Sequence, residues 1–269
     1  MTTSIKKALR SIYLACLHFI GRIRYKSRMV PQFIIIGTQK GGTSSLFYYL
    51  KTHPQIKRSI KKETHYFNKF YENGQKWYLA HFPAKSKSYI TGEATPDYLF
   101  HPDTPGRIKN LNPDIKLIVL LRNPIERAYS AYQMNRRFTI DPHETFEEAV
   151  NFELNHADNN TSEYTHDKHH FFYLKRGKYS EQLSKWLVHF SKSQFLVINS
   201  HNLFNNTNET ISKVHRFLEI DNVLPSSLKP MNVATYPPLS KELYSSLASY
   251  FKEDLQSLKN NWSVELQLV

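Results

Sequence analysis

One short segment, residues 33–50, constrains the fold of this chain more than any other. Four apolar residues, most of them β-branched, lead into Gly37, and then come a lysine, a glycine pair, three hydroxyl residues and a second apolar run. A buried strand, a tight glycine turn and a helix have this order, and the open N–H groups of such a turn bind anions. The segment therefore predicts a strand–loop–helix unit with an anion, most simply a phosphate, at the turn.

The lysine of this loop is displaced from the position it has in nucleotide-hydrolysing P-loops. In the spacing G-x-x-x-x-G-K-[ST], counted from Gly37, the lysine position holds Thr43, and the lysine stands three places earlier as Lys40. Glycines let the backbone approach an anion closely, and neighbouring hydroxyls add donors. A turn without a ligand is the alternative, although such a turn needs neither the lysine nor successive hydroxyls. The predicted anion site comprises Lys40, Gly41, Gly42, Thr43 and Ser44.

Strand-like and helix-like segments alternate along the rest of the chain. We expect strands at residues 88–95, 115–121 and 194–199, and helices at 125–133, 179–190, 209–218 and 241–258. The 115–121 strand is apolar on both faces, which is typical of a parallel sheet. The pattern predicts a three-layer, P-loop-like α/β fold with a central, mainly parallel sheet flanked by helices. Residues 31–269 are expected to form a single domain, in which the polar residues 136–175 are a cap or insertion.

A second anion site is predicted where the 115–121 strand ends. A kinase or NTPase would place an acidic Mg²⁺ ligand at such a strand end. Here the strand ends in Arg122, and Ser130 follows two turns along the next helix. A capping or salt-bridge role is the alternative for Arg122. Together with the displaced lysine, the arginine favours a ligand with two separated phosphates and no metal.

Composition narrows the partners and the compartment. The formal charge of +13 favours a polyanionic partner: nucleic acid, an acidic membrane face, a phosphorylated cofactor or an acidic polysaccharide. Cys16 is the one cysteine, so a cysteine-based metal site and an intrachain disulfide are excluded, and a reducing, cytoplasmic location is favoured.

The first thirty residues differ from the rest of the chain. Apolar residues recur there at helical spacing among cations, and the apolar run 12–20 is too short for a membrane span of about 20 residues. One interpretation is a basic amphipathic helix on an anionic membrane, and the other is a helix docked on the protein. A cleavable signal peptide is not expected, because no small-residue cleavage site follows.

The two anion motifs resemble those of sulfotransferases. Residues 37–46, GTQKGGTSSL, resemble the 5′-phosphosulfate loop, and residues 121–132, LRNPIERAYSAY, resemble the 3′-phosphate motif. The likeness runs from Phe33 to the last helix and is strongest to carbohydrate sulfotransferases of the heparan sulfate type and their bacterial relatives. It implies a sulfotransferase whose cofactor is 3′-phosphoadenosine 5′-phosphosulfate (PAPS), with no metal required. Lys40 and its loop would bind the phosphosulfate, and Arg122 and Ser130 the 3′-phosphate.

The resemblance also implies catalytic residues. In this family a glutamate in the basic segment after the first helix acts as the base, and KKETHYF places Glu63 in that role and His65 on the same face. His65 would transfer a proton or orient the glutamate. Neighbouring cations are expected to keep Glu63 ionised, although a plain salt bridge with Lys62 is the alternative. The acceptor would be a hydroxyl or amine of a carbohydrate or glycolipid. Lys62 and Arg137 are expected to bind an acidic sugar chain and Tyr98 to stack on a sugar ring, unless they only form a solvated rim.

This chain departs from the family pattern at several positions. Residues 231–243 lack the cysteines and the Lys-Gly-Arg run with which some relatives clamp the cofactor. Ala94 and Met134 stand where some relatives have a lysine and a histidine. These changes concern the acceptor and the clamp more than the reaction class. A nucleotide kinase with a degenerate P-loop and a non-catalytic polyanion-binding domain stay open as alternatives. Nucleic acid is not expected as a partner of a sulfotransferase.

Overall fold

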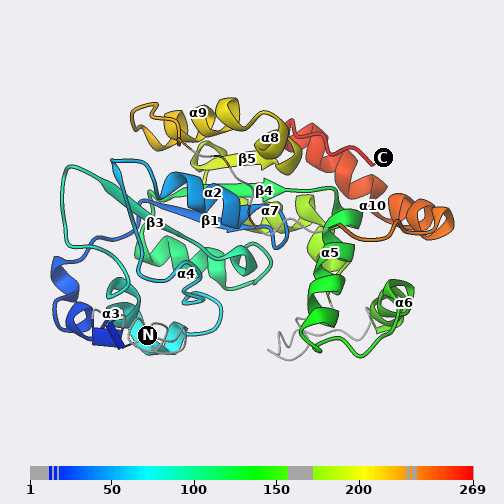
Figure 1. Ribbon diagram of the computed structural model, residues 1–269, viewed down its shortest axis with the longest axis horizontal. Helices are drawn as coiled ribbons and strands as arrows, with labels where there is room; N and C mark the ends of the chain where they lie inside the picture. The colour runs from blue at the N-terminus through cyan, green and yellow to red at the C-terminus, as the bar shows by residue number, and fades with distance from the viewer. Residues whose placement is uncertain are drawn as a thin grey trace.

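The computed structural model describes residues 12–13, 15–16, 18–156, 172–226, 228, 231 and 235–268 of the 269-residue chain. These residues form a five-stranded sheet of order β2-β3-β1-β4-β5, and every neighbouring pair of strands is parallel (Figure 1). The strands are β1 (Phe33–Gly37), β2 (Ile56–Arg58), β3 (Ile90–Ala94), β4 (Lys116–Leu121) and β5 (Phe195–Asn199). The predicted α/β fold is confirmed, and the sheet is wholly rather than mainly parallel.

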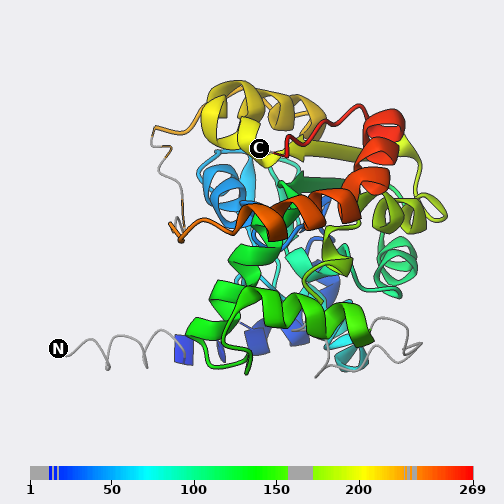
Figure 2. The same cartoon turned by 90° about the vertical axis from the view of Figure 1, so that its right-hand side faces the viewer.

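Helices cover both faces of the sheet and extend beyond one edge (Figures 1 and 2). They are α2 (Thr43–Leu50), α3 (Gly74–Leu79), α4 (Thr104–Leu111), α5 (Pro124–Arg137), α6 (Phe146–His156), α7 (Tyr179–Leu187), α8 (Ser200–Asn205), α9 (Thr207–Leu218) and α10 (Lys241–Trp262). Alternate side chains of β1 and β4 enter different cores, as the pleat of a strand requires. Ile34 packs with residues of α3, α4, α7 and α10, whereas Ile35 packs with residues of α2, α8 and α9.

Five elements were missed from the sequence, namely β2, α3, α4, α6 and α8. Strand β2 lies at the edge of the sheet and buries only Ile56, so it has no apolar alternation to detect. Helices α3 and α4 span only 6 and 8 residues, too few for a clear period. In the expected cap, α5 continues to Arg137, α6 follows, and residues 157–171 lie outside the described residues.

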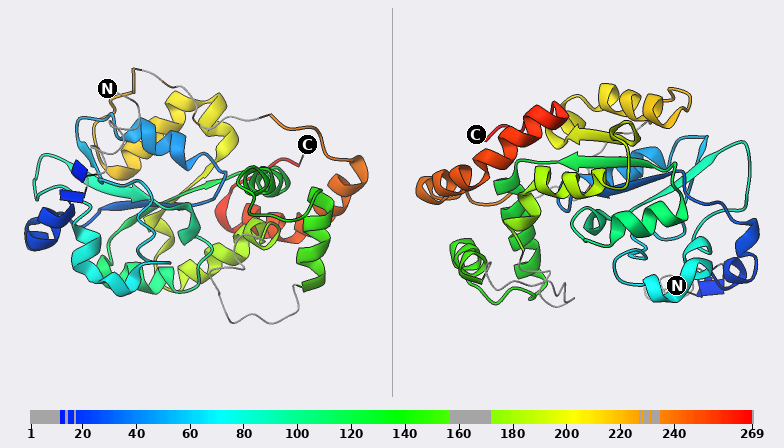
Figure 3. Two further views of the ribbon diagram at one scale, coloured as in Figure 1. Left: turned by 60° about the horizontal axis from the view of Figure 1, so that its bottom comes forward. Right: turned by 180° about the vertical axis from the view of Figure 1, so that it is seen from behind.

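The parallel sheet gathers the loops of interest at one edge. Because parallel strands end at the same edge, the segments after β1, β3 and β4 leave the sheet side by side. The Thr38 N–H donates to the Leu120 carbonyl at 2.8 Å, which ties the loop after β1 to the end of β4. Helix α5 continues from β4 and stands beyond this edge, with α6 outside it (Figure 3).

Candidate active site

The loop between β1 and α2 has the geometry of an anion cradle. Gly42 caps α2 in the left-handed region, at φ 95°, without a side-chain hydrogen bond. The first-turn N–H groups of α2, residues 43–45, therefore have no intrahelical acceptor and remain open to a ligand. A Cβ on Gly41 would lie 2.7 Å from the Leu120 carbonyl oxygen, so the close approach of loop and strand requires glycine. Ser200 donates to the Gly41 carbonyl at 2.6 Å and holds the loop from α8.

Cations surround this cradle. Lys40 has a positive φ of 69° and forms no ion pair with any described residue. Burial, and then the charges of Arg137 and Arg122, lower the pKa of Lys40. Arg122, just before α5, and Arg137, the last residue of α5, thus place like charges near the lysine, and an anion bound there would relieve their repulsion. Ser130, the other predicted 3′-phosphate ligand, is buried on the same helix. These residues fit a ligand with anionic groups.

Arg122 already has a partner in the structure. Its Nε and Nη2 atoms lie 3.0 and 2.9 Å from Glu126 Oε2, one turn along α5. The salt bridge that was the alternative for Arg122 is therefore formed. A phosphate at this position would have to share the guanidinium with Glu126 or replace that contact.

Glu63 lies in a small charged group. Lys62 Nζ donates to Glu63 Oε1 at 2.5 Å, and His65 Nε2 lies 3.5 Å from Glu63 Oε2. Burial by itself would raise the pKa of Glu63, but the hydrogen bonds and charges of His65 and Lys62 outweigh it and lower the pKa. The carboxylate is therefore ionised at neutral pH, as expected of a base. Lys62 contacts this carboxylate directly. The position of Lys62 is therefore compatible both with a plain salt bridge to Glu63 and with a role in the site.

The histidine connects this group to a second, buried ion pair. His65 Nδ1 lies 3.9 Å from Asp97 Oδ2, and Asp97 Oδ1 lies 2.8 Å from Arg176 Nη1. Burial would raise the pKa of Asp97, yet the charge of Arg176 prevails and lowers it to about 2. The order glutamate, histidine, aspartate, arginine thus runs from the surface inward. Sequence reasoning missed Asp97 and Arg176, because 79 positions separate them in the chain.

A small cavity joins the cradle to this ion pair. It measures about 30 Å³, enough for a water molecule. Its walls include Gln39 of the loop after β1 and both Asp97 and Arg176, together with Lys69, Asn135, Phe172 and Tyr173. Gln39, the residue before Lys40, and Asp97, which faces His65, therefore line the same cavity.

Tyr98 does not have the predicted role. Its side chain is fully buried, and its hydroxyl donates to Glu93 Oε1 at 3.1 Å, so stacking on a sugar is excluded in this structure. Glu93 is itself fully buried and also accepts from Tyr78, Thr95 and Thr64. Burial raises the pKa of Glu93, and the hydrogen bonds oppose that rise. Because Thr64 lies between Glu63 and His65 in the sequence, its hydrogen bonds to Glu93 anchor the segment of Glu63 and His65 on β3.

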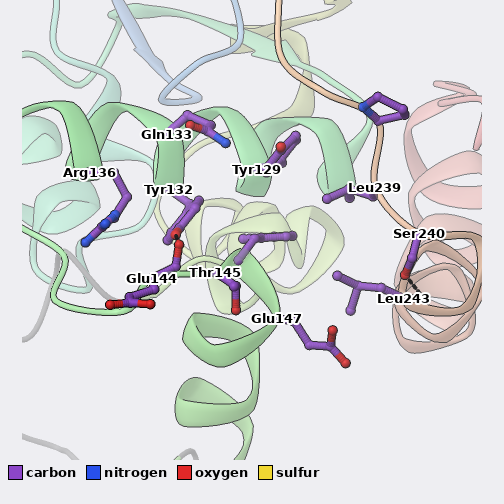
Figure 4. A pocket seen from close by; sticks show the side chains of 12 residues that line it. Tyr129, Tyr132, Gln133, Arg136, Glu144, Thr145, Glu147, Leu239, Ser240 and Leu243 are labelled. Carbon is purple, nitrogen blue, oxygen red and sulfur yellow. Dashed lines mark hydrogen bonds between the residues drawn. The ribbon is translucent and has the colours of Figure 1, made fainter.

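A larger cavity lies outside the predicted site. It measures about 360 Å³ and opens between α5, the start of α6 and residues 238–243 (Figure 4). Tyr129, Tyr132 and Arg136 of α5 face it, but none of the predicted site residues lines it. Arg137, the next residue, is exposed and places its guanidinium 5.0 Å from the Phe138 ring centroid. Residues 238–243 belong to the stretch in which some relatives have the Lys-Gly-Arg run, and here they form one wall of this cavity.

Comparisons with known proteins find similar sequences and structures. The model of the sulfotransferase domain family matches residues 30–254. The chain is 28% identical to the membrane-associated sulfotransferase kil1 of Dictyostelium discoideum, over 95% of this chain and 69% of that protein. It is 32% identical to human heparan sulfate glucosamine 3-O-sulfotransferase 6 over 73% of this chain, and spans about half (54%) of that relative's length. A crystal structure of a sulfotransferase from Alicyclobacillus acidocaldarius superposes with a TM-score of 0.76 at 26% identity, covering 88% of this chain and 98% of that one.

Proposed function

The chain belongs to the sulfotransferase domain family, whose sulfuryl donor is PAPS, and from this premise we propose that it sulfates a hydroxyl or amine of a carbohydrate or glycolipid. The observation that carries the proposal is the meeting of two features at one edge of the sheet. An open helix N-terminus with an unpaired lysine lies after β1, and an ionised glutamate lies in the segment that β3 anchors. The carbohydrate acceptor is supported by the names of the 3-O-sulfotransferase relatives.

Each residue of the site has a part in this proposal. PAPS would supply an activated sulfuryl group on a phosphate leaving group. Lys40 and the N–H groups of residues 42–44 would hold that phosphate and neutralise the charge that develops on it. The Gly41 N–H, also predicted to bind the anion, donates instead to the Thr38 carbonyl at 2.9 Å. Arg122 and Ser130 would hold the 3′-phosphate, with Arg122 turning away from Glu126. The basic side chains of Lys62 and Arg137 would attract an acidic acceptor.

Proton transfer is assigned to Glu63. Its carboxylate would take the proton of the acceptor hydroxyl, a contribution worth roughly 10²–10⁴ in rate. His65 would hold Glu63 in position, since its other nitrogen faces Asp97. Glu63 joins a lowered carboxylate pKa to a side chain that is 40% exposed, whereas Asp97, whose pKa is also lowered, is 17% exposed and paired with Arg176.

The place of action is proposed to be a membrane surface facing the cytoplasm. Support comes from the Dictyostelium relative, which is named as membrane-associated and aligns with 95% of this chain. None of the helices described in the structure has the length and apolar character needed to cross a bilayer. A peripheral contact through the first thirty residues is proposed from their basic amphipathic pattern.

Thermal unfolding with nucleotides tests the cofactor site. We expect 3′,5′-ADP without metal to stabilise the protein, by about 2.7 kcal/mol at a concentration of about 100 Kd, and ATP–Mg²⁺ to have little effect. Lys40→Ala should abolish most of this stabilisation. Lys213→Ala, which removes an exposed lysine from an i,i+4 pair on α9, is the matched control and should behave as the parent. Stabilisation by ATP–Mg²⁺ alone, or an unchanged response in Lys40→Ala, would contradict the assignment.

Labelled PAPS tests the transfer and the acceptor. The protein should move label to a heparan-type oligosaccharide or to a glycolipid, and Glu63→Gln should lose about 10²–10⁴ in kcat while still binding 3′,5′-ADP. Glu72→Gln, a change at an exposed carboxylate, is the control. Full transfer by Glu63→Gln would remove the glutamate from its role, and label on neither acceptor class would remove the proposed substrate.

A further inference from the structure

The N-terminal helical segment, whose described residues lie between positions 12 and 23, is docked on the protein by one side only. A Cβ on Gly21 would lie 2.6 Å from the Ala80 carbonyl oxygen, so the backbones are in close contact there. His18 Nε2 lies 3.0 Å from the Trp77 carbonyl oxygen, and its ring centroid lies 4.3 Å from that of His81. The side of the segment that bears Gly21 and His18 therefore packs against α3, next to which it is drawn in dark blue in Figure 1.

Large apolar side chains occupy the opposite side. At 3.6 residues per turn, Ile12, Phe19 and Ile23 point away from the side of Gly21. Phe19 and Ile23 are 65% and 69% exposed, and Tyr13 and Ile20 widen the same exposed stripe. A helix of a soluble protein normally turns such a stripe toward the core. None of the residues that the structure describes covers this stripe, and a contiguous exposed apolar stripe of this kind marks a contact surface.

Positive charge is in excess toward the N-terminal end of the chain, and seven lysines and arginines lie within the first thirty residues. Thirteen lysines and arginines precede the first carboxylate, Glu63, and this number equals the formal excess of +13. The remaining residues are therefore balanced in charge. Arg22 and Arg24 are exposed beside the apolar stripe, and Lys26 follows them. The partner of this surface must accept apolar side chains and present negative charge around them.

We propose that the stripe of Ile12, Tyr13, Phe19, Ile20 and Ile23 enters the interface of an anionic lipid bilayer, with Arg22 and Arg24 at the head groups. A second copy of the chain would bring these cations against one another, which disfavours a symmetric dimer. Nucleic acid would engage the cations but leave the apolar stripe in water. The inference rests on the proposed membrane location and is independent of sulfuryl transfer, since binding needs no turnover.

Vesicle sedimentation of the full chain tests this surface. We expect strong binding to phosphatidylcholine vesicles that contain phosphatidylglycerol, weak binding to phosphatidylcholine alone, and loss of binding in high salt. Phe19→Ser combined with Ile23→Ser should lower the partition coefficient by at least about tenfold. Arg22→Gln should lower it about fivefold on the anionic vesicles only. Val188→Ser is the matched control, because Val188 is 80% exposed at the end of α7, and should not change binding.

Three outcomes would overturn the proposal. They are equal binding to neutral and anionic vesicles, unchanged binding of the double serine variant, and a dimer in vesicle-free light scattering that the double variant loses. The variant sites are exposed, and circular dichroism checks that both variants are folded. The response to 3′,5′-ADP is measured on the same samples. If 3′,5′-ADP fails to bind while the vesicle results hold, the proposed cofactor site is wrong and the membrane surface stands.

Discussion

Asp97→Asn removes the buried charge that links Arg176 to His65. The pKa of Asp97 is about 2 in the folded chain, against an ordinary value of 3.8. At about 1.4 kcal/mol per pKa unit, the ionised carboxylate contributes about 2 kcal/mol to the free energy of unfolding. Because the folded pKa is the lower one, this contribution is complete above pH 3.8 and is lost as the pH falls toward 2. Arg176 is nearly buried and would be left unpaired, so we expect a total loss of about 3 kcal/mol at neutral pH.

Urea unfolding and initial rates measure the two consequences. Asp103→Asn is the control, because it breaks an exposed i,i+4 pair with Arg107 and should cost only about 0.5 kcal/mol or less. If His65 positions Glu63, Asp97→Asn should also lower kcat about tenfold while 3′,5′-ADP binds as before. A stability equal to that of the parent would refute the assignment of a buried ion pair. An unchanged kcat in a destabilised variant would refute the positioning of Glu63 through His65.

Three further predictions concern the loop, the buried carboxylate and pH. Gly41→Ala should weaken 3′,5′-ADP binding in calorimetry by tenfold or more, because the added Cβ would meet the Leu120 carbonyl oxygen at 2.7 Å. Gly106→Ala is the control and should bind 3′,5′-ADP normally, because its added Cβ would meet no atom closer than 3.4 Å. Glu93→Gln should lower the free energy of unfolding by about 3 kcal/mol, because an amide NH₂ would replace an acceptor among buried donors; a melting temperature equal to that of the parent would contradict this. Burial lowers the pKa of His81 and of His101 from 6.5 to about 4, so the unfolded chain takes up protons at a higher pH than the folded chain does. The free energy of unfolding should therefore fall as the pH drops from 6.5 to 4, by up to about 3 kcal/mol for each histidine. Urea midpoints that stay constant across this range would exclude this effect.

Local patterns were sufficient wherever neighbouring residues determine the structure. Strands β3, β4 and β5 and helices α5, α7, α9 and α10 lie within a few residues of the predicted ranges, because long apolar periods are read directly. Tyr98 was misplaced because a tyrosine near a strand end is equally compatible with a surface or a core position. Its burial depends on Glu93 and on the aromatic rings of α3 and its flanking segment, such as Tyr78 and Phe67, which no local pattern reveals.

The sequence by itself determined the class of fold, the anion loop with its displaced lysine, and the segment that carries Glu63. The loop and the Glu63 segment are each encoded within a stretch shorter than twenty residues, and the class of fold follows from the alternation of strand-like and helix-like stretches along the chain. Only the tertiary structure decided that Asp97 pairs with Arg176, that Ser200 holds Gly41, and that the apolar side of the N-terminal segment faces outward. The physical reason is that parallel strands bring distant loops to one edge, and side-chain packing then selects which of their groups meet.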